Sequence, residues 1–249
     1  MVEHDGRAPV ATFFFADALV SGTTATLGEA PALHARVKRL SRGDPVTLTN
    51  GCGDLAAGRL AMLRRDSIDV IVDEVHSVPR PAAIHLCVAI ADRDRMLWLA
   101  EKCTELGISS WQPVRFRRSA SVVPRGEGRS FAAKTRARMI GAIEQSHGAW
   151  LPELRPEMNV DDLGRSDGQL RILLDLHGPP LLTVVPLGAR REVVVLFGPE
   201  GGMEPSEMEL LTGTGWRPAR LARTVLRFET AGIAAVAVLR AASLDTKEG

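Results

Sequence analysis

One stretch of this 249-residue chain constrains its fold more than any other. Residues 193–197 are an unbroken apolar run, Val-Val-Val-Leu-Phe, which predicts a strand buried on both faces of a parallel sheet. The run ends in Gly198-Pro-Glu-Gly-Gly202, and a helix-like segment follows from about Pro205. Glycine-rich loops at the carboxyl ends of such strands often bind ligands, because glycine lets a ligand approach the backbone closely. The loop alone leaves two alternatives, a tight structural turn or a ligand loop.

The remainder of the chain predicts two domains, residues 1–77 and 78–249, joined at a proline-bearing linker. The first domain favours a small, mostly antiparallel β barrel with one short helix. Its β segments are expected at 12–15, 45–49, 58–63 and 68–75, and its helix at about 30–40. In the second domain strands alternate with helices, which predicts an α/β fold with a largely parallel sheet. The strands are expected at 84–90, 108–114, 170–176, 193–197 and 219–221, and the helices include 95–106 and 130–146, with Ser130 as N-cap.

Four motifs, in order along the chain, resemble the signatures of one known family. They are Arg95-Met-Leu-Trp98 running into Glu101–Gly107, Glu144-Gln-Ser146 followed by Pro152-Glu-Leu154, Gly198–Gly202, and Leu221–Ala231. Together they are similar to the RsmE-type 16S ribosomal RNA uridine-N3 methyltransferases of the SPOUT superfamily. The resemblance implies a SPOUT-type, trefoil-knotted methyltransferase domain preceded by a PUA-like β-barrel RNA-binding domain. It also implies S-adenosylmethionine as cofactor, 16S rRNA or the small ribosomal subunit as partner, and a homodimer.

By the same resemblance, three loops form the cofactor pocket. The residues carried over as cofactor-binding are Leu174, His177, Phe197, Gly198, Pro199, Glu200, Gly201, Gly202, Leu221, Leu226, Arg227, Thr230 and Ala231. Core packing is the alternative for Leu221 and Leu226, and His177 could equally be an ordinary loop histidine. Glu200 is expected to brace its loop rather than to move protons.

By the same resemblance, Arg227 and Glu229 stand where the family places its active-site loop, and they are the candidate catalytic residues. Uridine N3 carries a weakly acidic proton that must leave before the nitrogen can attack a methyl donor. A positioned base would accept that proton, whereas a nearby cation would stabilise the resulting anion. Arg227 suits the second role or a phosphate contact, while Glu229 is either the base or a carboxylate at the start of the following helix.

A basic run predicts an RNA-binding surface on a chain whose net charge is only +1. It comprises Arg115, Arg117, Arg118, Arg125, Arg129, Lys134, Arg136 and Arg138, against the single acid Glu127. A smaller patch in the first domain contains Arg36, Lys38 and Arg39. A solvated helix face is the alternative for any such run. Two patches suit a structured RNA that is recognised by its shape and backbone.

Several other classes of function are disfavoured. The three cysteines are widely spaced, which fits neither a disulfide framework nor a zinc site, and no other metal motif is present. No G-x-G-x-x-G follows a strand, and no phosphate-binding loop with lysine occurs. The sequence shows no signal peptide and no apolar stretch near the ~18 residues that span a bilayer. These features predict a cytoplasmic protein that uses no metal and no membrane.

The chain departs from the family pattern where RNA contacts are expected. His147-Gly-Ala149 stands where the family commonly has Gly-Arg-Asn, and Thr12 lies near the place of a family arginine. Glu204 replaces the usual Ser or Thr before the helix at Pro205. Two rival functions therefore stay open. One is a SPOUT methyltransferase for another RNA or base, and the other is a non-catalytic RNA-binding ribosome-assembly factor.

Overall fold

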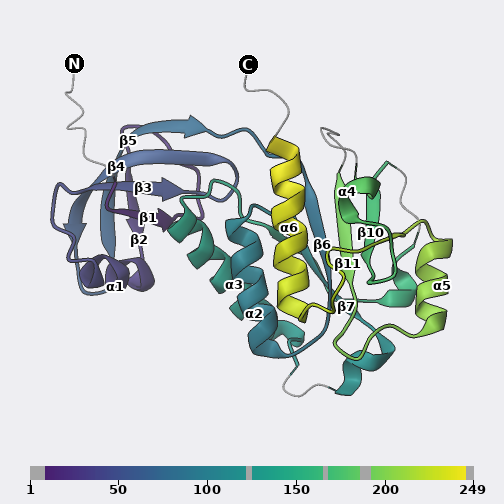
Figure 1. Ribbon diagram of the computed structural model, residues 1–249. Coiled ribbons are helices and arrows are strands. Elements are labelled where there is room, and N and C mark those ends of the chain that lie inside the picture. The colour runs from purple at the N-terminus through teal and green to yellow at the C-terminus, as the bar shows by residue number, and fades with distance from the viewer. Residues whose placement is uncertain (1–8, 122–124, 165–167, 186–191, 245–249) are drawn as a thin grey trace. The chain divides into compact units, whose positions relative to one another are not determined.

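A computed structural model describes residues 9–121, 125–164, 168–185 and 192–244 (Figure 1). The chain forms two compact units. The first takes in the described residues up to Arg80 together with Ile140–Leu151, and the second takes in Pro81–Met139 and the described residues from Pro152 onward. The mixed α/β fold with a parallel sheet, predicted from the alternating pattern, is confirmed.

The first unit is built on a five-stranded sheet of order β1-β3-β4-β5-β2 within the described residues. Its elements are β1 (Ala11–Phe14), β2 (Thr24–Leu27), α1 (Glu29–Val37), β3 (Pro45–Thr49), β4 (Asp54–Leu63) and β5 (Ile68–Ser77). β1 and β3 are parallel, and the other pairs are antiparallel. Alternate side chains of these strands, among them Phe13, Leu48 and Leu60, are fully buried in one apolar core.

The segment Ile140–Leu151 is bonded into this first unit. The backbone N–H of Phe14 donates to Glu144 Oε1 at 2.8 Å, and Thr49 Oγ1 donates to the carbonyl of Gly148 at 2.9 Å. Thr12 Oγ1 and His147 Nδ1 lie 2.6 Å apart. Thr12 and His147 both belong to the departures from the family pattern where RNA contacts are expected, so the structure brings these two departures together.

Glu144 gives a pH-dependent prediction for this unit. Its burial raises the pKa of the carboxyl, while the hydrogen bond from Phe14 opposes that shift. A raised folded-state pKa means that the native state holds its proton longer, so this group's contribution falls as pH rises above about 4.3. Glu144→Gln keeps an acceptor for Phe14 but carries no charge. Its midpoint of thermal unfolding should exceed that of the wild type by about 1–3 °C at pH 7.

The same difference should narrow as the pH falls from the raised folded-state pKa toward the unfolded value of about 4.3, because the wild-type side chain becomes neutral over this interval. Thermal unfolding followed by circular dichroism between pH 4 and 8 measures it. A difference that stays constant over this range would contradict a role for the Glu144 charge.

The second unit is built on a parallel sheet of order β12-β10-β11-β6-β7-β8, with β9 also paired to β7. Its strands are β6 (Ile84–Ala89), β7 (Ser110–Arg115), β8 (Glu153–Leu154), β9 (Met158–Asn159), β10 (Leu170–Leu174), β11 (Val193–Phe197) and β12 (Arg217–Ala219). Its helices are α2 (Arg93–Glu105), η1 (Arg117–Ser121), α3 (Gly128–Ser146, which continues into the first unit), η2 (Val160–Asp162), α4 (Leu181–Val184), α5 (Pro205–Gly213) and α6 (Phe228–Leu244).

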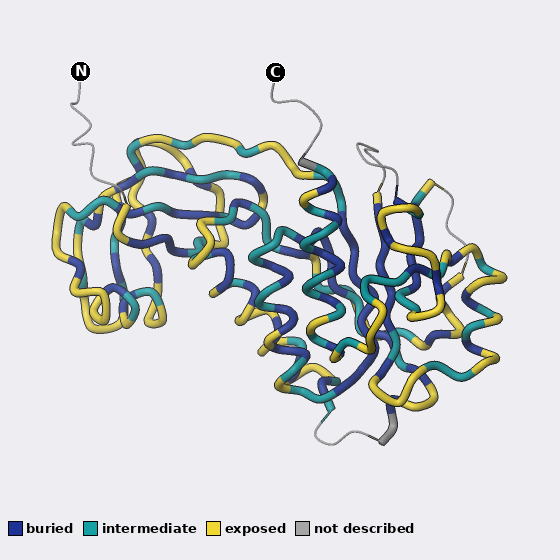
Figure 2. Tube along the Cα trace, in the orientation of Figure 1, coloured by how far each residue is buried: buried dark blue, intermediate teal, exposed yellow. Residues whose placement is uncertain are grey.

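The core of this unit lies around β6 and β11, whose residues are all buried (Figure 2). Helices α2 and α6 lie side by side against the sheet (Figure 1). Gly232 permits the close packing of α6, because a Cβ there would lie 2.7 Å from Leu99 Cδ1 and 2.9 Å from Phe197 Cζ. Arg240, also on α6, donates to the carbonyls of Ala82 and Leu106. The run at 193–197 is therefore the buried parallel strand that it was predicted to be.

Two local predictions are wrong. Ser130 is not the N-cap of its helix, because α3 begins at Gly128, whose φ of 81° is a turn conformation. The last strand, predicted at 219–221, lies at Arg217–Ala219. Glu204, which replaces the usual Ser or Thr, is the N-cap of α5 and forms a capping box with Glu207, to whose Oε2 its backbone N–H donates at 2.7 Å.

Candidate active site

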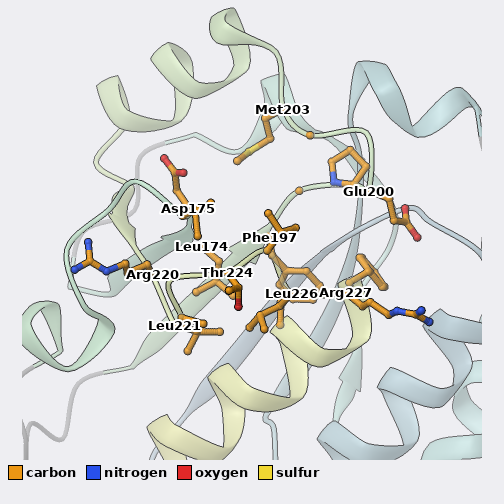
Figure 3. A pocket seen from close by; sticks show the side chains of 18 of the residues that line it. Leu174, Asp175, Phe197, Glu200, Met203, Arg220, Leu221, Thr224, Leu226 and Arg227 are labelled. Carbon is orange, nitrogen blue, oxygen red and sulfur yellow. The ribbon is translucent and has the colours of Figure 1, made fainter.

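A cavity in the second unit opens where β10, β11 and β12 end. The three strands end at the same height in the sheet, since Leu174 pairs with both Phe197 and Ala219. Their carboxyl-terminal loops therefore converge on one cavity of about 590 Å³ (Figure 3). This is the place in a parallel sheet where ligands bind.

Most of the predicted cofactor residues line this cavity. They are Leu174, Phe197, Gly198, Pro199, Glu200, Gly202, Leu221, Leu226, Arg227 and Ala231. Gly201 and Thr230 belong to the same segments, but their atoms are not part of the lining. His177 lines a second, neighbouring cavity with Arg217 and Pro218, and Asp175 contributes to both cavities. The structure therefore does not bring His177 together with the main group.

The turn after β10 lies directly on the chain that follows β12. Asp175 N–H donates to the carbonyl of Ala219 at 2.9 Å, and Arg220 Nη1 donates to the carbonyl of Gly178 at 2.9 Å. A Cβ on Gly178 would lie 2.6 Å from the backbone nitrogen of Ala219, so only glycine fits between the two segments. Asp175, Leu176, Ala219 and Arg220 of these two segments line the cavity, whereas Gly178 lines the neighbouring one.

The cavity has an apolar centre and charged edges. Leu174, Phe197 and Leu226 lie between Asp175 and Arg220 on one side and Glu200 and Arg227 on the other (Figure 3). Such a combination, apolar walls with a few polar groups and open backbone, suits a ligand with a flat heterocycle and a polar tail.

Arg95, at the edge of the cavity, is a site residue that sequence reasoning did not select. Its Nη1 lies 3.7 Å from Glu200 Oε1 and 3.8 Å from Glu229 Oε2. It therefore bridges the glycine loop and the start of α6. Glu229 does not line the cavity, and its buried Oε2 accepts no hydrogen bond from the described residues. The sequence signal that could have pointed to Arg95 is the Arg95–Trp98 motif, of which it is the first residue.

Several arginines of the basic run form ion pairs with nearby acids. Arg115 and Arg125 both pair with Glu127, at 2.7 Å and 2.9 Å, and Arg115 also contacts Glu157. Arg138 pairs with Glu101 at 3.1 Å. Glu157 and Glu101, two acids outside the run, thus neutralise part of it, which counting charges within the run could not detect.

The other predicted RNA contacts take different positions. Arg117 and Arg118 contact the glycine loop and the start of α5. The side chains of Arg129, Lys134 and Arg136 are exposed on α3. In the first unit Arg36, Lys38 and Arg39 are exposed at the end of α1.

Other chemistry finds little support in the part of the chain that the structure describes. It contains no group of three or more His, Cys, Asp or Glu side chains placed to hold a metal ion. Burial raises the pKa of the Cys103 thiol and raises that of Cys87 to about 12, which leaves both protonated at neutral pH. None of the described helices combines the length and apolar character needed to span a membrane.

Comparison with known proteins identifies the family. Residues 78–240 match the RNA methyltransferase domain family. The chain is 29% identical to the ribosomal RNA small subunit methyltransferase E of Mycobacterium bovis, over 91% of this chain and 90% of that protein. It is 26% identical to the protein of the same name from Synechocystis, over 94% of this chain and 77% of the relative.

Two solved structures share the fold. A Legionella pneumophila methyltransferase in complex with S-adenosylmethionine superposes with a TM-score of 0.83 and 27% identity, covering 95% of this chain and 98% of that one. The ribosomal RNA small subunit methyltransferase E of Neisseria gonorrhoeae superposes with a TM-score of 0.84 and 24% identity, over 93% and 97% of the two chains. The resemblance predicted from four motifs is thereby confirmed, and the chain belongs to the RNA methyltransferase family.

Proposed function

We propose that this chain is an S-adenosylmethionine-dependent methyltransferase that methylates N3 of a uridine in 16S ribosomal RNA. The observation that carries the proposal is the cavity that three loops build together, two of them being sequence motifs of the family. Relatives named ribosomal RNA small subunit methyltransferase E match over most of the chain. A non-catalytic binding protein would have no need of such a cavity.

The residues at this cavity fit S-adenosylmethionine. A volume of about 590 Å³ lies within the range of small-molecule sites. Gly198 lines the cavity, and the loop can pack as it does only with glycine there, because a Cβ would lie 2.8 Å from Met203 Cγ. The loops at Leu174, Phe197–Gly202 and Leu221–Ala231 would hold the cofactor. When bound, it supplies a methyl group on a positively charged sulfonium, which a nucleophilic nitrogen can attack.

Arg227 is the proposed catalytic residue. Its side chain is exposed at the edge of the cavity, so its cation can face the uridine and stabilise the anion left when N3 loses its proton. Arg95 is proposed to fix Glu200 and Glu229 at that edge. Glu229 lies in the first turn of α6 and outside the cavity lining, which supports the helix-stabilising role more than that of a base.

We assign RNA binding to both parts of the chain. Residues 1–77 are proposed as a PUA-like barrel domain and residues 78–249 as a trefoil-knotted SPOUT domain that forms a homodimer. Exposed basic residues on α1 and α3, including Arg36, Lys134 and Arg136, are the proposed backbone contacts. Action on ribosomal RNA would take place in the cytoplasm.

Isothermal titration calorimetry tests the cofactor assignment. The purified chain should bind S-adenosylmethionine at one site per chain, with a dissociation constant on the order of micromolar, about −8 kcal/mol. Adenosine alone should bind more weakly because it lacks the amino-acid tail. Absence of binding heat with S-adenosylmethionine, in protein whose circular dichroism spectrum is that of a folded chain, would overturn the proposal.

A different RNA target is the second candidate. It is favoured by the hydrogen bond between Thr12 and His147, because both positions lack the residues that the family pattern would place there. Mass spectrometry of the methylated nucleoside separates the candidates. Methyl transfer to an RNA other than 16S rRNA, or to another base, would favour the second.

A further inference from the structure

The basic turn η1 is bonded to the glycine loop of the cavity. Arg118 Nη1 donates to the carbonyl of Gly201 at 3.0 Å, and its Nε lies 4.0 Å from Glu204 Oε1. The side chain lies along the loop, since a Cβ built on Gly201 would be 3.5 Å from Arg118 Cβ. One arginine of the predicted RNA-binding run therefore positions the backbone of the predicted cofactor loop.

A buried carboxylate holds η1 in this place. Glu207 is 1% exposed, and its two oxygens accept from the backbone N–H groups of Arg117 at 2.8 Å and of Glu204 at 2.7 Å. Arg117 Nη1 also donates to Ser206 Oγ at 2.7 Å. One carboxylate thus accepts hydrogen bonds both from η1 and from Glu204, which follows the glycine loop. A shift of η1 should therefore move the loop with it.

The same two arginines face solvent. The side chains of Arg117 and Arg118 are 52% and 49% exposed. A guanidinium carries five N–H donors, so one that donates to a carbonyl can also bind a phosphate. An exposed arginine side chain loses rotamer entropy when it becomes ordered. If an RNA phosphate has already ordered the side chain, that entropy is not lost again when the cofactor binds.

We propose that Arg118 couples RNA binding to cofactor binding. In this inference, which depends on the proposed function, an RNA phosphate held by Arg118 fixes the Gly201 carbonyl and with it the loop at Gly198–Gly202. RNA and cofactor then strengthen each other's binding, and the effect is reciprocal by linkage. Arg118 acts through the loop, so it is a positioning residue.

Equilibrium dialysis with S-adenosylhomocysteine tests the coupling, because this product binds without methyl transfer. Its dissociation constant is measured with and without saturating 16S rRNA transcript, and RNA retention on filters is measured in parallel. For the wild type, RNA should tighten binding at least about fivefold. Arg65→Ala removes one exposed charge of the first unit, outside the proposed RNA contacts and the loop, and it should keep that ratio. Arg118→Ala should bring the ratio close to one.

A second variant distinguishes loss of the coupling from structural damage to the glycine loop. Arg118→Gln keeps an N–H for the Gly201 carbonyl but loses the charge that holds phosphate. It should bind S-adenosylhomocysteine nearly as the wild type does without RNA, and RNA should no longer tighten that binding. A wild-type ratio in either Arg118 variant, or no RNA effect in the wild type although both ligands bind, would overturn the coupling. Failure of the wild type to bind S-adenosylhomocysteine at all would instead overturn the proposed function.

Discussion

Arg227→Ala should lower the rate of methyl transfer at least about a hundredfold, the usual cost of removing a charge-stabilising donor. Its affinity for S-adenosylmethionine should stay within about threefold of wild type, because a group that acts on the uridine anion contributes little to ground-state cofactor binding. Because the Arg227 side chain is exposed, its removal should leave the fold intact, so unfolding would not explain such a loss of rate. Single-turnover transfer of labelled methyl groups to 16S rRNA, combined with calorimetry, measures both quantities.

Arg223→Ala is the matched control for Arg227. It removes the same charge from the same loop, but Arg223 is exposed and does not line the cavity. Its rate should remain near that of the wild type. Equal losses in both variants would assign the effect to general RNA attraction, and a normal rate in Arg227→Ala would contradict the catalytic role.

Gly178→Ala should damage both the fold and the cavity. The added Cβ would lie 2.6 Å from the nitrogen and 2.8 Å from the Cα of Ala219, and a backbone neighbour cannot rotate away as a side chain can. Overpacking of this kind costs about 1–3 kcal/mol of stability. Since the displaced segments form a wall of the cavity, cofactor affinity should fall at least about tenfold, or 1.4 kcal/mol.

Gly141→Ala controls for the loss of a glycine as such. It lies in α3 with open space where the Cβ would be, so this variant should be more stable by about 0.5–1 kcal/mol. Denaturant unfolding and calorimetry on both variants test the pair. Unchanged cofactor affinity in Gly178→Ala would mean that the turn after β10 is not part of the cofactor site.

The elements that sequence pattern predicted well are those with a strong local signal. The apolar run at Val193–Phe197 and the segment Pro45–Thr49 were placed at their observed bounds. β2 (Thr24–Leu27) was missed, because it is only four residues long and just two of them, Ala25 and Leu27, face the core. β4 begins at Asp54, earlier than the predicted residue 58, since its first residues follow a turn whose Asn and Gly residues obscure the strand pattern.

The candidate site was predictable where one motif supplied a whole loop. The loops at Phe197–Gly202 and Leu221–Ala231 could be selected in this way, and most of their residues line the cavity. The contacts of Arg95 with Glu200 and Glu229, and of Arg118 with Gly201, join residues more than 80 positions apart in the chain. Sequence separation of this size carries no local periodicity, so only the fold reveals such pairs.

The most direct test of the central claim is mass spectrometry of nucleosides from 16S rRNA, isolated from cells with and without this gene. The account predicts that 3-methyluridine disappears when the gene is deleted. The intact gene should restore it, and the Arg227→Ala variant should not. An unchanged level of 3-methyluridine in the deletion strain would contradict the proposed reaction.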